Sequence, residues 1–261
     1  KPGDKFRLAD IDPDGKHWHH DRKEAEKEFK KLRKELIEWQ RKLYSEGKQR
    51  LLIVFQAMDA GGKDGTIRKV FTGVNPQGVQ VTSFKAPTSH ELAHDYLWRI
   101  HQQVPATGMI RIFNRSHYED VLIVRVDNLV PEKVWKARYE QINRFEAHLV
   151  ETGTTVLKFY LHISKDEQKA RFEERLDDPL KHWKFSLDDL AKRKQWDNYM
   201  AAYEDAISRC SQEHAPWYVI PANQNWYRDL LVARTIVHTL RNMNPDYPPP
   251  KSDFSGVTVE D

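Results

Sequence analysis

The sequence has a single cysteine, little glycine and proline, and no long apolar segment. Cys210 cannot form an internal disulfide bond, no cysteine cluster is present to hold zinc, and we expect an inert thiol on a helix. With 11 Gly, 13 Pro and 39% hydrophobic residues among 261, the composition excludes collagenous, low-complexity and disordered proteins. No apolar run approaches the length of a membrane span and the N-terminal segment lacks a signal-peptide pattern, so we expect a cytoplasmic protein without a membrane partner.

The chain also carries little net charge. Its 42 Lys and Arg residues are nearly balanced by 39 Asp and Glu residues, which leaves +3. This balance does not indicate a nucleic-acid partner. If an anion is bound, a local group of basic side chains in a cleft must bind it, because field lines concentrate there.

Five short runs of apolar and β-branched residues alternate with helical patterns from residue 50 onward. The runs cover residues 51–55, 79–84, 109–113, 155–163 and 217–221. Repetition of strand, helix and strand predicts an α/β fold with a parallel sheet covered by helices on both faces. Amphipathic patterns predict helices over about 19–46 and 131–151. The terminal segments 1–18 and 245–261 have no periodicity, and we expect them to be loosely docked.

A glycine-rich loop follows the first predicted strand, in the sequence AMDAGGKDGT. Gly61 and Gly62 let backbone N–H groups face an oxyanion at a helix N-terminus, and Lys63 can reach a terminal phosphate. In the usual phosphate-loop (Walker A) pattern a glycine stands at Ala57 and a hydroxyl residue at Asp64. The alternative is a tight turn with a surface lysine. The order of strand, loop and helix favours a phosphate site.

Asp59 lies inside this loop, where a carboxylate would repel bound phosphates unless a cation separated them. Mg²⁺ is the expected cation, because it is normally held by one or two carboxylates together with phosphates. The alternative is an aspartate that only stabilises the turn.

Polar side chains also follow the third predicted strand, in the sequence NRSHYEDVL. We therefore expect four of these residues at the carboxyl edge of the sheet, where open α/β sheets bind ligands: Asn114, Arg115, Ser116 and Glu119. Arg115 can clamp a phosphoryl group, and Glu119 can orient a metal-bound water or an acceptor. The alternatives are a surface arginine and a glutamate that stabilises a helix turn. His117 has no base or orienting partner in the sequence, so we expect a structural or solvent-facing histidine rather than a phosphorylated one.

Residues 165–194 read as a helix, a break at Pro179 and a second helix, an arrangement typical of a mobile lid. Four basic residues of this hairpin are candidates for binding an anion: Arg171, Arg175, Lys181 and Lys184. Acidic residues are almost as frequent in the segment, and by charge alone it also fits an ordinary solvated hairpin.

Taken together, these motifs resemble the family 2 polyphosphate kinases, and most closely the branch called class III. AMDAGGKDGT is similar to the family's phosphate loop, FNRSHYEDVL to its second motif and RFEERLDDPLKHWK to its lid signature. The motifs occur in the expected order over roughly residues 50–190. The flanking N-terminal helix and the segment WYVIPANQNWYRDLL are similar as well. Three motifs in order are far more specific than one phosphate loop.

The resemblance implies a P-loop kinase-like three-layer α/β sandwich with a parallel sheet and a helical lid, built as a single domain over residues 1–261. It implies transfer of phosphoryl groups between inorganic polyphosphate and nucleoside mono- and diphosphates. Mg²⁺, with Mn²⁺ as a substitute, is the implied cofactor. A homo-oligomer of two or four chains is the implied assembly.

The resemblance also implies roles for particular residues. The catalytic residues would be Asp59, Lys63 and Arg115. Residues that bind phosphate or nucleotide would be Ala60, Gly61, Gly62, Asp64, Gly65, Ser116 and Glu119. The lid residues that bind polyphosphate would be Arg171, Arg175, Lys181 and Lys184. The metal ligands would be Asp59 and Glu119.

The second motif departs from the other branches of the family, which often have Asp at the position of Asn114 and Asn at that of Glu119. The extra carboxylate of Glu119 leads us to expect that both AMP and ADP are phosphorylated, with ATP as the final product. Two other functions remain open at this stage, namely an ATP-dependent nucleoside monophosphate kinase and a noncatalytic module that binds nucleotide or polyanion. The chain has no N-K-x-D motif for reading guanine.

Overall fold

The computed structural model of the chain describes residues 7–15, 21–253, 255 and 257–259. The strands are β1 Arg50–Gln56, β2 Val79–Ser83, β3 Ile110–Asn114, β4 Thr154–His162 and β5 Trp217–Pro221. The longer helices are α1 Arg22–Glu46, α2 Lys63–Val70, α6 Glu132–Glu151, α7 Lys165–Asp177, α8 Leu187–Lys194, α9 Trp196–Cys210 and α10 Asn225–Met243. The short helical turns are η1 Leu8–Asp10, η2 Pro76–Gly78, α3 Ser89–Leu92, α4 Trp98–His101, η3 His117–Val121, α5 Ile123–Val126 and η4 Pro179–Lys184.

The five strands form one parallel sheet in the order β2-β3-β1-β4-β5. Each strand lies within one residue of its expected bounds, because a strand buried on both faces carries an uninterrupted apolar run that is legible in the sequence. Residues 51–55 of β1 are fully buried between β3 and β4. The register aligns Phe55 with Asn114 of β3 and Phe159 of β4, so the segments after β1, β3 and β4 leave the sheet at the same edge.

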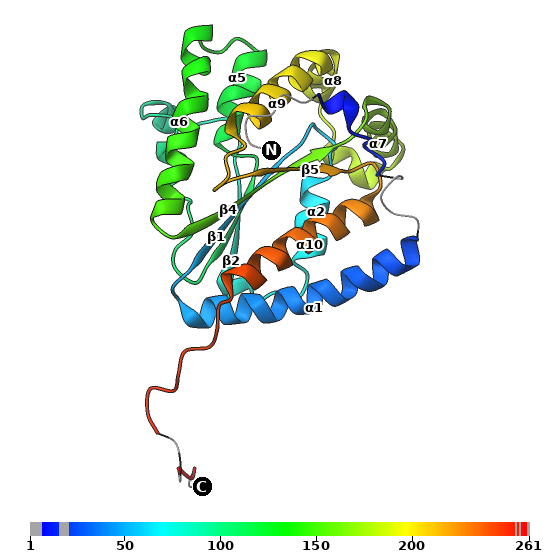
Figure 1. The fold of residues 1–261 in the computed structure, drawn as a ribbon. Coiled ribbons are helices and arrows are strands. Elements are labelled where there is room, and N and C mark those ends of the chain that lie inside the picture. The colour runs from blue at the N-terminus through cyan, green and yellow to red at the C-terminus, as the bar shows by residue number, and fades with distance from the viewer. Residues whose placement is uncertain (1–6, 16–20, 254, 256, 260–261) are drawn as a thin grey trace.

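Helices cover both faces of the sheet, as Figure 1 shows. The helices α1, α2 and α10 lie on one face, and α5, α6 and α9 lie on the other. The hairpin of α7, η4 and α8 stands beyond the carboxyl edge of the sheet. The predicted three-layer arrangement with a helical hairpin is confirmed. Within the described residues, no helix is both long and apolar enough to cross a membrane.

The long N-terminal helix is confirmed as α1, which begins at Arg22. Asp21 is its N-cap, and the Asp21 side chain accepts hydrogen bonds from two backbone N–H groups of the first turn. The predicted start near residue 19 lies outside the described residues. The helix ends at Gly47, whose φ of 65° is the left-handed conformation that glycine adopts without strain. The second expected helix is confirmed as α6.

The prediction of a loosely docked N-terminal segment is wrong for residues 7–15. Leu8 is 1% exposed, and its backbone N–H donates to Glu204 Oε1 at 2.7 Å. Pro13 O accepts from Asn223 N at 3.0 Å. Aperiodic segments carry no sequence signal for such long-range contacts. The C-terminal segment leaves α10 and runs away from the body of the fold, as expected (Figure 1).

Candidate active site

The loop after β1 brings backbone N–H groups to the N-terminus of α2. Gly62 is the N-cap of this helix, with a φ of 94°. Its positive φ would strain any other residue, and a Cβ atom placed on Gly62 would lie 2.1 Å from Arg228 Nη1, so both conformation and space favour glycine. With no capping side chain at Gly62, the first N–H groups of α2 are available to an anion.

Lys63 is the first residue of α2 and is only 9% exposed. Its Nζ donates to Ala57 O at 3.0 Å, across the phosphate loop. Burial and the neighbouring Arg115 guanidinium lower the pKa of Lys63, while the carboxylates of Asp59, Glu119 and Asp64 act in the opposite direction. The ammonium group is therefore placed among carboxylates at the edge of a cavity, where an added phosphate would favour its charged form.

Asp59 is held by two cations, one on each carboxylate oxygen. Arg115 Nη2 lies 3.0 Å from Oδ1, and Lys192 Nζ lies 3.6 Å from Oδ2. Burial alone would raise the pKa of Asp59, but the positive charges of Lys63, Lys192 and Arg115 outweigh it and lower the pKa. Asp59 is thus kept as a carboxylate, the form that binds a metal ion.

The segment after β3 forms the second wall of the site. Arg115 adopts a left-handed conformation with a φ of 62°, which costs a non-glycine residue roughly 1–2 kcal/mol. A hydrogen bond from Arg115 N to Phe55 O at 3.1 Å holds this turn against β1. Asn114 Nδ2 donates to Asp64 Oδ1 at 2.6 Å and so links the second motif to the phosphate loop. Strain of this kind is typical of functional sites.

Glu119 and Ser116 are connected through Gln56, the last residue of β1. With its amide nitrogen facing Glu119, Gln56 donates to Oε1 at 3.0 Å, and its oxygen accepts from Ser116 N and Oγ. Ser116 is fully buried, and its Oγ also accepts from Tyr118 N. Ser116 therefore supports the turn into η3, and Glu119 is oriented by the sheet itself.

A cavity of about 780 Å³ lies between the phosphate loop, the second motif and the helical hairpin. Ten of the predicted site residues line it, which are Asp59, Ala60, Gly61, Gly62, Lys63, Asp64, Gly65, Arg115, Arg175 and Lys184, and Asn114 lines it as well. A smaller cavity of about 20 Å³ adjoins it, and Asp59, Arg115 and Glu119 all border this second space. The three predicted residues that line neither cavity are Ser116, Arg171 and Lys181.

Two of the four basic lid side chains, Arg171 and Lys181, bind other parts of the protein and do not line the cavity. Arg171 donates to Ala60 O at 2.9 Å and Ala222 O at 2.7 Å, and so fastens α7 to the phosphate loop. Lys181 pairs with Glu174 at 2.8 Å and with Asp178 at 3.1 Å, outside the cavity.

The other two lid cations border the cavity. Arg175 Nη1 donates to the Lys184 carbonyl at 3.2 Å, and Asp189 Oδ2 lies 3.9 Å from the same nitrogen. The hairpin thus presents Arg175 and Lys184 to the cavity and uses Arg171 as a structural link.

Several cavity residues were not found from the sequence. Lys85 stands two residues after the end of β2, so the rule that ligands bind at the carboxyl edge would have predicted it if applied to this strand. Arg68 stands one helical turn after Asp64 on α2 and lines the same wall. No local signal marks Trp183 and Asp189 on the hairpin or Lys192 at the small cavity, because only the folding of the hairpin over the loop brings them there.

The residues at the small cavity fit a magnesium ion completed by substrate. Asp59 and Glu119 both border this space next to the phosphate loop, and their carboxylates are the hard oxygen ligands that Mg²⁺ prefers. Among the residues that the structure describes, no group of three or more His, Cys, Asp or Glu side chains could hold a metal by itself. Two carboxylates plus phosphate oxygens are the usual set for Mg²⁺ in kinases.

Comparison with known proteins decides the family. The sequence model described as Polyphosphate kinase 2 (PPK2) matches residues 19–248. The chain belongs to the polyphosphate kinase 2 family. The predicted family and enzyme class are thereby confirmed. Residues from all three motifs of this polyphosphate kinase line its cavity.

Individual relatives of this polyphosphate kinase agree with the match. The chain is 55% identical to the AMP/ADP-polyphosphate phosphotransferase of Meiothermus ruber over 261 residues, which are 100% of this chain and 98% of the relative. It is 48% identical to the ADP-polyphosphate phosphotransferase of Rhodopseudomonas palustris over 225 residues, 82% of this chain and 78% of the relative. The crystal structure of polyphosphate kinase 2 from Arthrobacter aurescens TC1 superimposes with a TM-score of 0.93 at 45% identity, covering 97% and 91% of the two chains.

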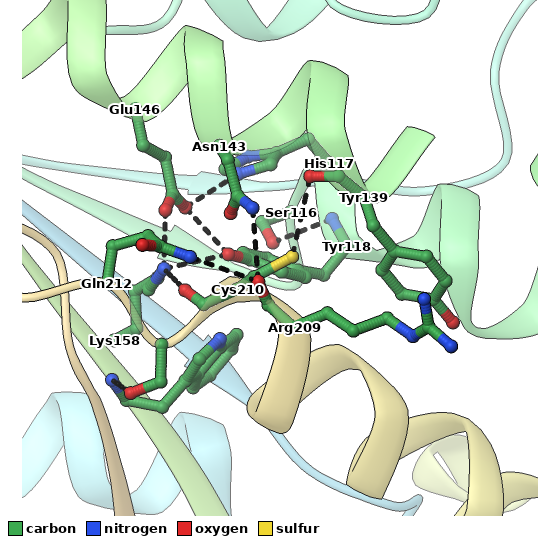
Figure 2. A network of polar contacts seen from close by, with 12 residues as sticks. Ser116, His117, Tyr118, Tyr139, Asn143, Glu146, Lys158, Arg209, Cys210 and Gln212 are labelled. Atoms are coloured by element: carbon green, nitrogen blue, oxygen red, sulfur yellow. Dashed lines mark hydrogen bonds and ion pairs between the residues drawn. The ribbon is translucent and has the colours of Figure 1, made fainter. Parts of the chain in front are cut away.

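A buried polar network lies behind the second motif of this polyphosphate kinase (Figure 2). His117 is fully buried, and its Nε2 lies 3.1 Å from Glu146 Oε1. Glu146 also accepts from Tyr118 and is paired with Lys158, which in turn donates to the Cys210 carbonyl at 2.7 Å. Burial would raise the pKa of Glu146, but Lys158 and His117 outweigh it and lower the pKa. His117 is therefore structural, as expected, and has no access to the cavity.

Cys210 is fully buried at the end of α9. Burial raises the pKa of its thiol to about 12. A buried thiol without thiolate character is chemically inert, as the sequence predicted.

Proposed function

We propose that this polyphosphate kinase phosphorylates both AMP and ADP with inorganic polyphosphate as donor, by direct in-line transfer. The observation that carries the proposal is the shared cavity of about 780 Å³, which brings Asp59, Lys63 and Arg115 together with Arg175 and Lys184. The volume has room for a nucleotide beside a phosphate chain. A relative that is 55% identical over the whole chain bears the name AMP/ADP-polyphosphate phosphotransferase.

The roles of the residues follow from the chemistry of phosphoryl transfer. The transition state spreads negative charge over the equatorial oxygens, and catalysis depends mainly on alignment and on neutralising this charge. Lys63, Arg115 and the backbone N–H groups of residues 61–65 provide the positive charge. Asp64 orients Asn114, and Gln56 orients Glu119, so the walls of the site are fixed before the substrates bind.

Mg²⁺, or Mn²⁺ in its place, is the proposed cofactor, with Asp59 and Glu119 as its protein ligands. When bound, the ion supplies charge neutralisation between the carboxylates and the phosphate oxygens. Arg115 Nη2 holds Asp59 Oδ1 at 3.0 Å and thereby fixes the orientation of the carboxylate.

The first experiment tests which compound donates the phosphoryl group. Purified protein should be supplied with AMP, ADP, GMP or GDP and with either polyphosphate or ATP as the phosphoryl donor. The proposal expects ADP and then ATP from AMP with polyphosphate alone. Product from AMP only when ATP is supplied would indicate a nucleoside monophosphate kinase, and no product in any mixture would indicate a noncatalytic binding module.

Removing Arg175 and Lys184 together should raise the KM for polyphosphate at least about tenfold, because each loses a charge-assisted contact to the chain. The KM for nucleotide should rise less, and the difference should grow with salt concentration. Steady-state kinetics at two ionic strengths measure this. Lys181→Ala, which removes a lid charge outside the cavity, is the control, and it should leave both KM values nearly unchanged. Equal effects of the double variant on the two substrates would contradict lid binding of polyphosphate.

Glu119→Asn should reduce phosphorylation of AMP more than that of ADP. The reacting oxygens of a monophosphate lie one phosphate unit nearer the nucleoside, and the extra carboxylate can hold a metal or its water to bridge this gap. The kcat/KM for each acceptor should be measured separately with polyphosphate as donor. We expect about a tenfold selective loss with AMP, the cost of one hydrogen-bonded ligand of about 1.4 kcal/mol. An equal loss with both acceptors would reduce Glu119 to a structural role.

A further inference from the structure

Lys192 of α8 contacts the carboxylate that the proposed function assigns to the metal. Its Nζ lies 3.6 Å from Asp59 Oδ2, and the two side chains are 25% and 15% exposed. Lys192 also borders the small cavity together with Asp59 and Glu119. A cation of the protein itself therefore lies at the oxygens where the metal would bind.

The two helices of the hairpin are fastened to the phosphate loop in different ways. Helix α7 donates to backbone carbonyls, through Gln168 Nε2 to Asp59 O at 2.9 Å and Arg171 Nη1 to Ala60 O at 2.9 Å. These bonds do not depend on the charge of the Asp59 side chain. Helix α8 reaches the loop through Lys192 and the Asp59 carboxylate. Only the second contact competes with a metal ion for the same oxygen.

Helix α8 is poorly held by packing. Its eight residues contain no buried side chain, and Leu187 is 77% exposed. Its other links are polar contacts to α7: Arg193 Nη1 donates to Lys165 O at 2.6 Å and to Gln168 Oε1 at 3.1 Å, and Asp189 Oδ2 lies 3.9 Å from Arg175 Nη1. A short exposed helix has little stability of its own, so the loss of one ionic contact is expected to change its dynamics.

A divalent ion on Asp59 would place like charges side by side. Lys192 and the ion would share one carboxylate at a largely buried position, where repulsion is screened less than at the surface. We propose that Lys192 is a positioning residue that holds α8 on the Asp59 carboxylate until a divalent cation takes its place, so that metal binding releases α8 from the phosphate loop. The inference rests on the proposed function only through the assignment of the metal to Asp59.

Metal affinity gives the first test. Free Mn²⁺ counted by electron paramagnetic resonance measures binding to the wild type and to Lys192→Met, Lys192→Arg and Lys194→Met. Lys192→Met should bind Mn²⁺ about tenfold more tightly, because a competing cation is removed. Lys192→Arg keeps the charge and should resemble the wild type. Lys194→Met, which removes an exposed neighbouring charge, is the matched control. Equal affinity in Lys192→Met and wild type would overturn the proposal.

Hydrogen exchange of the hairpin gives a readout that is independent of activity. In the wild type, Mg²⁺ should speed amide exchange over residues 187–194 and leave residues 165–177 unchanged. In Lys192→Met, residues 187–194 should exchange fast with or without Mg²⁺. No effect of Mg²⁺ on these residues in the wild type would contradict release of α8.

Two measurements distinguish failure of the proposed role of Lys192 from failure of the proposed function. Asp59→Asn should lose Mn²⁺ affinity in the same assay, and unchanged affinity would remove Asp59 as ligand and with it the role of Lys192. Formation of ADP and ATP from AMP by the wild type tests the activity itself and does not depend on Lys192.

Discussion

Replacing Lys63 with alanine is expected to lower kcat/KM with polyphosphate and AMP by about a hundredfold or more. Lys63 is 9% exposed and lines the cavity at the N-terminus of α2, where the proposed function places the transferring phosphoryl group. Losing one pre-positioned charge that acts on the transition state costs on the order of 3 kcal/mol. Steady-state kinetics with purified protein measure the loss, and kcat should fall with kcat/KM because the contact is strongest in the transition state.

The control for this variant is Lys69→Ala, which removes an exposed lysine from the last turn of the same helix. It should retain nearly full activity. Thermal unfolding establishes that both variants are folded, which is expected because, among the described residues, Lys63 Nζ donates one hydrogen bond, to the loop carbonyl of Ala57. Near wild-type turnover by folded Lys63→Ala would show that the loop does not bind the transferring group.

Asp59→Asn is expected to lower activity on the order of a hundredfold and to raise the Mg²⁺ concentration needed for half-maximal rate. The substitution keeps the size of the side chain and removes the negative charge that would hold the metal ion against the phosphates. It also weakens the pairing with Arg115 at 3.0 Å, so the loss has two sources. High Mg²⁺ should restore part of the rate if metal binding is the larger source.

Titration of the rate with Mg²⁺ for wild type, Asp59→Asn and Asp166→Asn separates these sources. Asp166 is an exposed carboxylate at the start of α7, and its removal should leave the titration unchanged. A low rate of Asp59→Asn that does not respond to Mg²⁺ would assign the residue to the orientation of Arg115. Full activity of the wild type in EDTA would remove the metal from the mechanism.

The strands and the phosphate loop were predictable because their signals are local. The run LLIVF over residues 51–55 reads as a strand buried on both faces, and the glycines and lysine that follow it are contiguous. The rule that ligands bind at the carboxyl edge then placed Arg115 beside the loop. Its strand β3 is distant in sequence: Ile110 pairs with Leu51 of β1, 59 residues earlier in the chain.

The remaining features depend on contacts between distant segments. The spacing of Arg171 and Arg175 placed them on one face of a helix, but it could not show that Arg171 turns to the carbonyls of Ala60 and Ala222. Lys192 meets Asp59 only because α8 folds back over the loop. The hairpin carries both basic and acidic residues, so each charged side chain has several possible partners nearby. Tertiary structure, rather than local sequence, determines which partner each side chain binds.

A single-turnover experiment with ³²P-labelled polyphosphate tests the central claim most directly. Wild-type protein, AMP and Mg²⁺ are mixed with the labelled donor and quenched at intervals, and label is measured on nucleotide and on protein. We predict that label appears on ADP and then ATP without first appearing on the protein, and that Lys63→Ala slows this transfer by about a hundredfold or more. Labelled protein that forms before labelled nucleotide, or nucleotide that never acquires label, would contradict direct transfer from polyphosphate in this cavity.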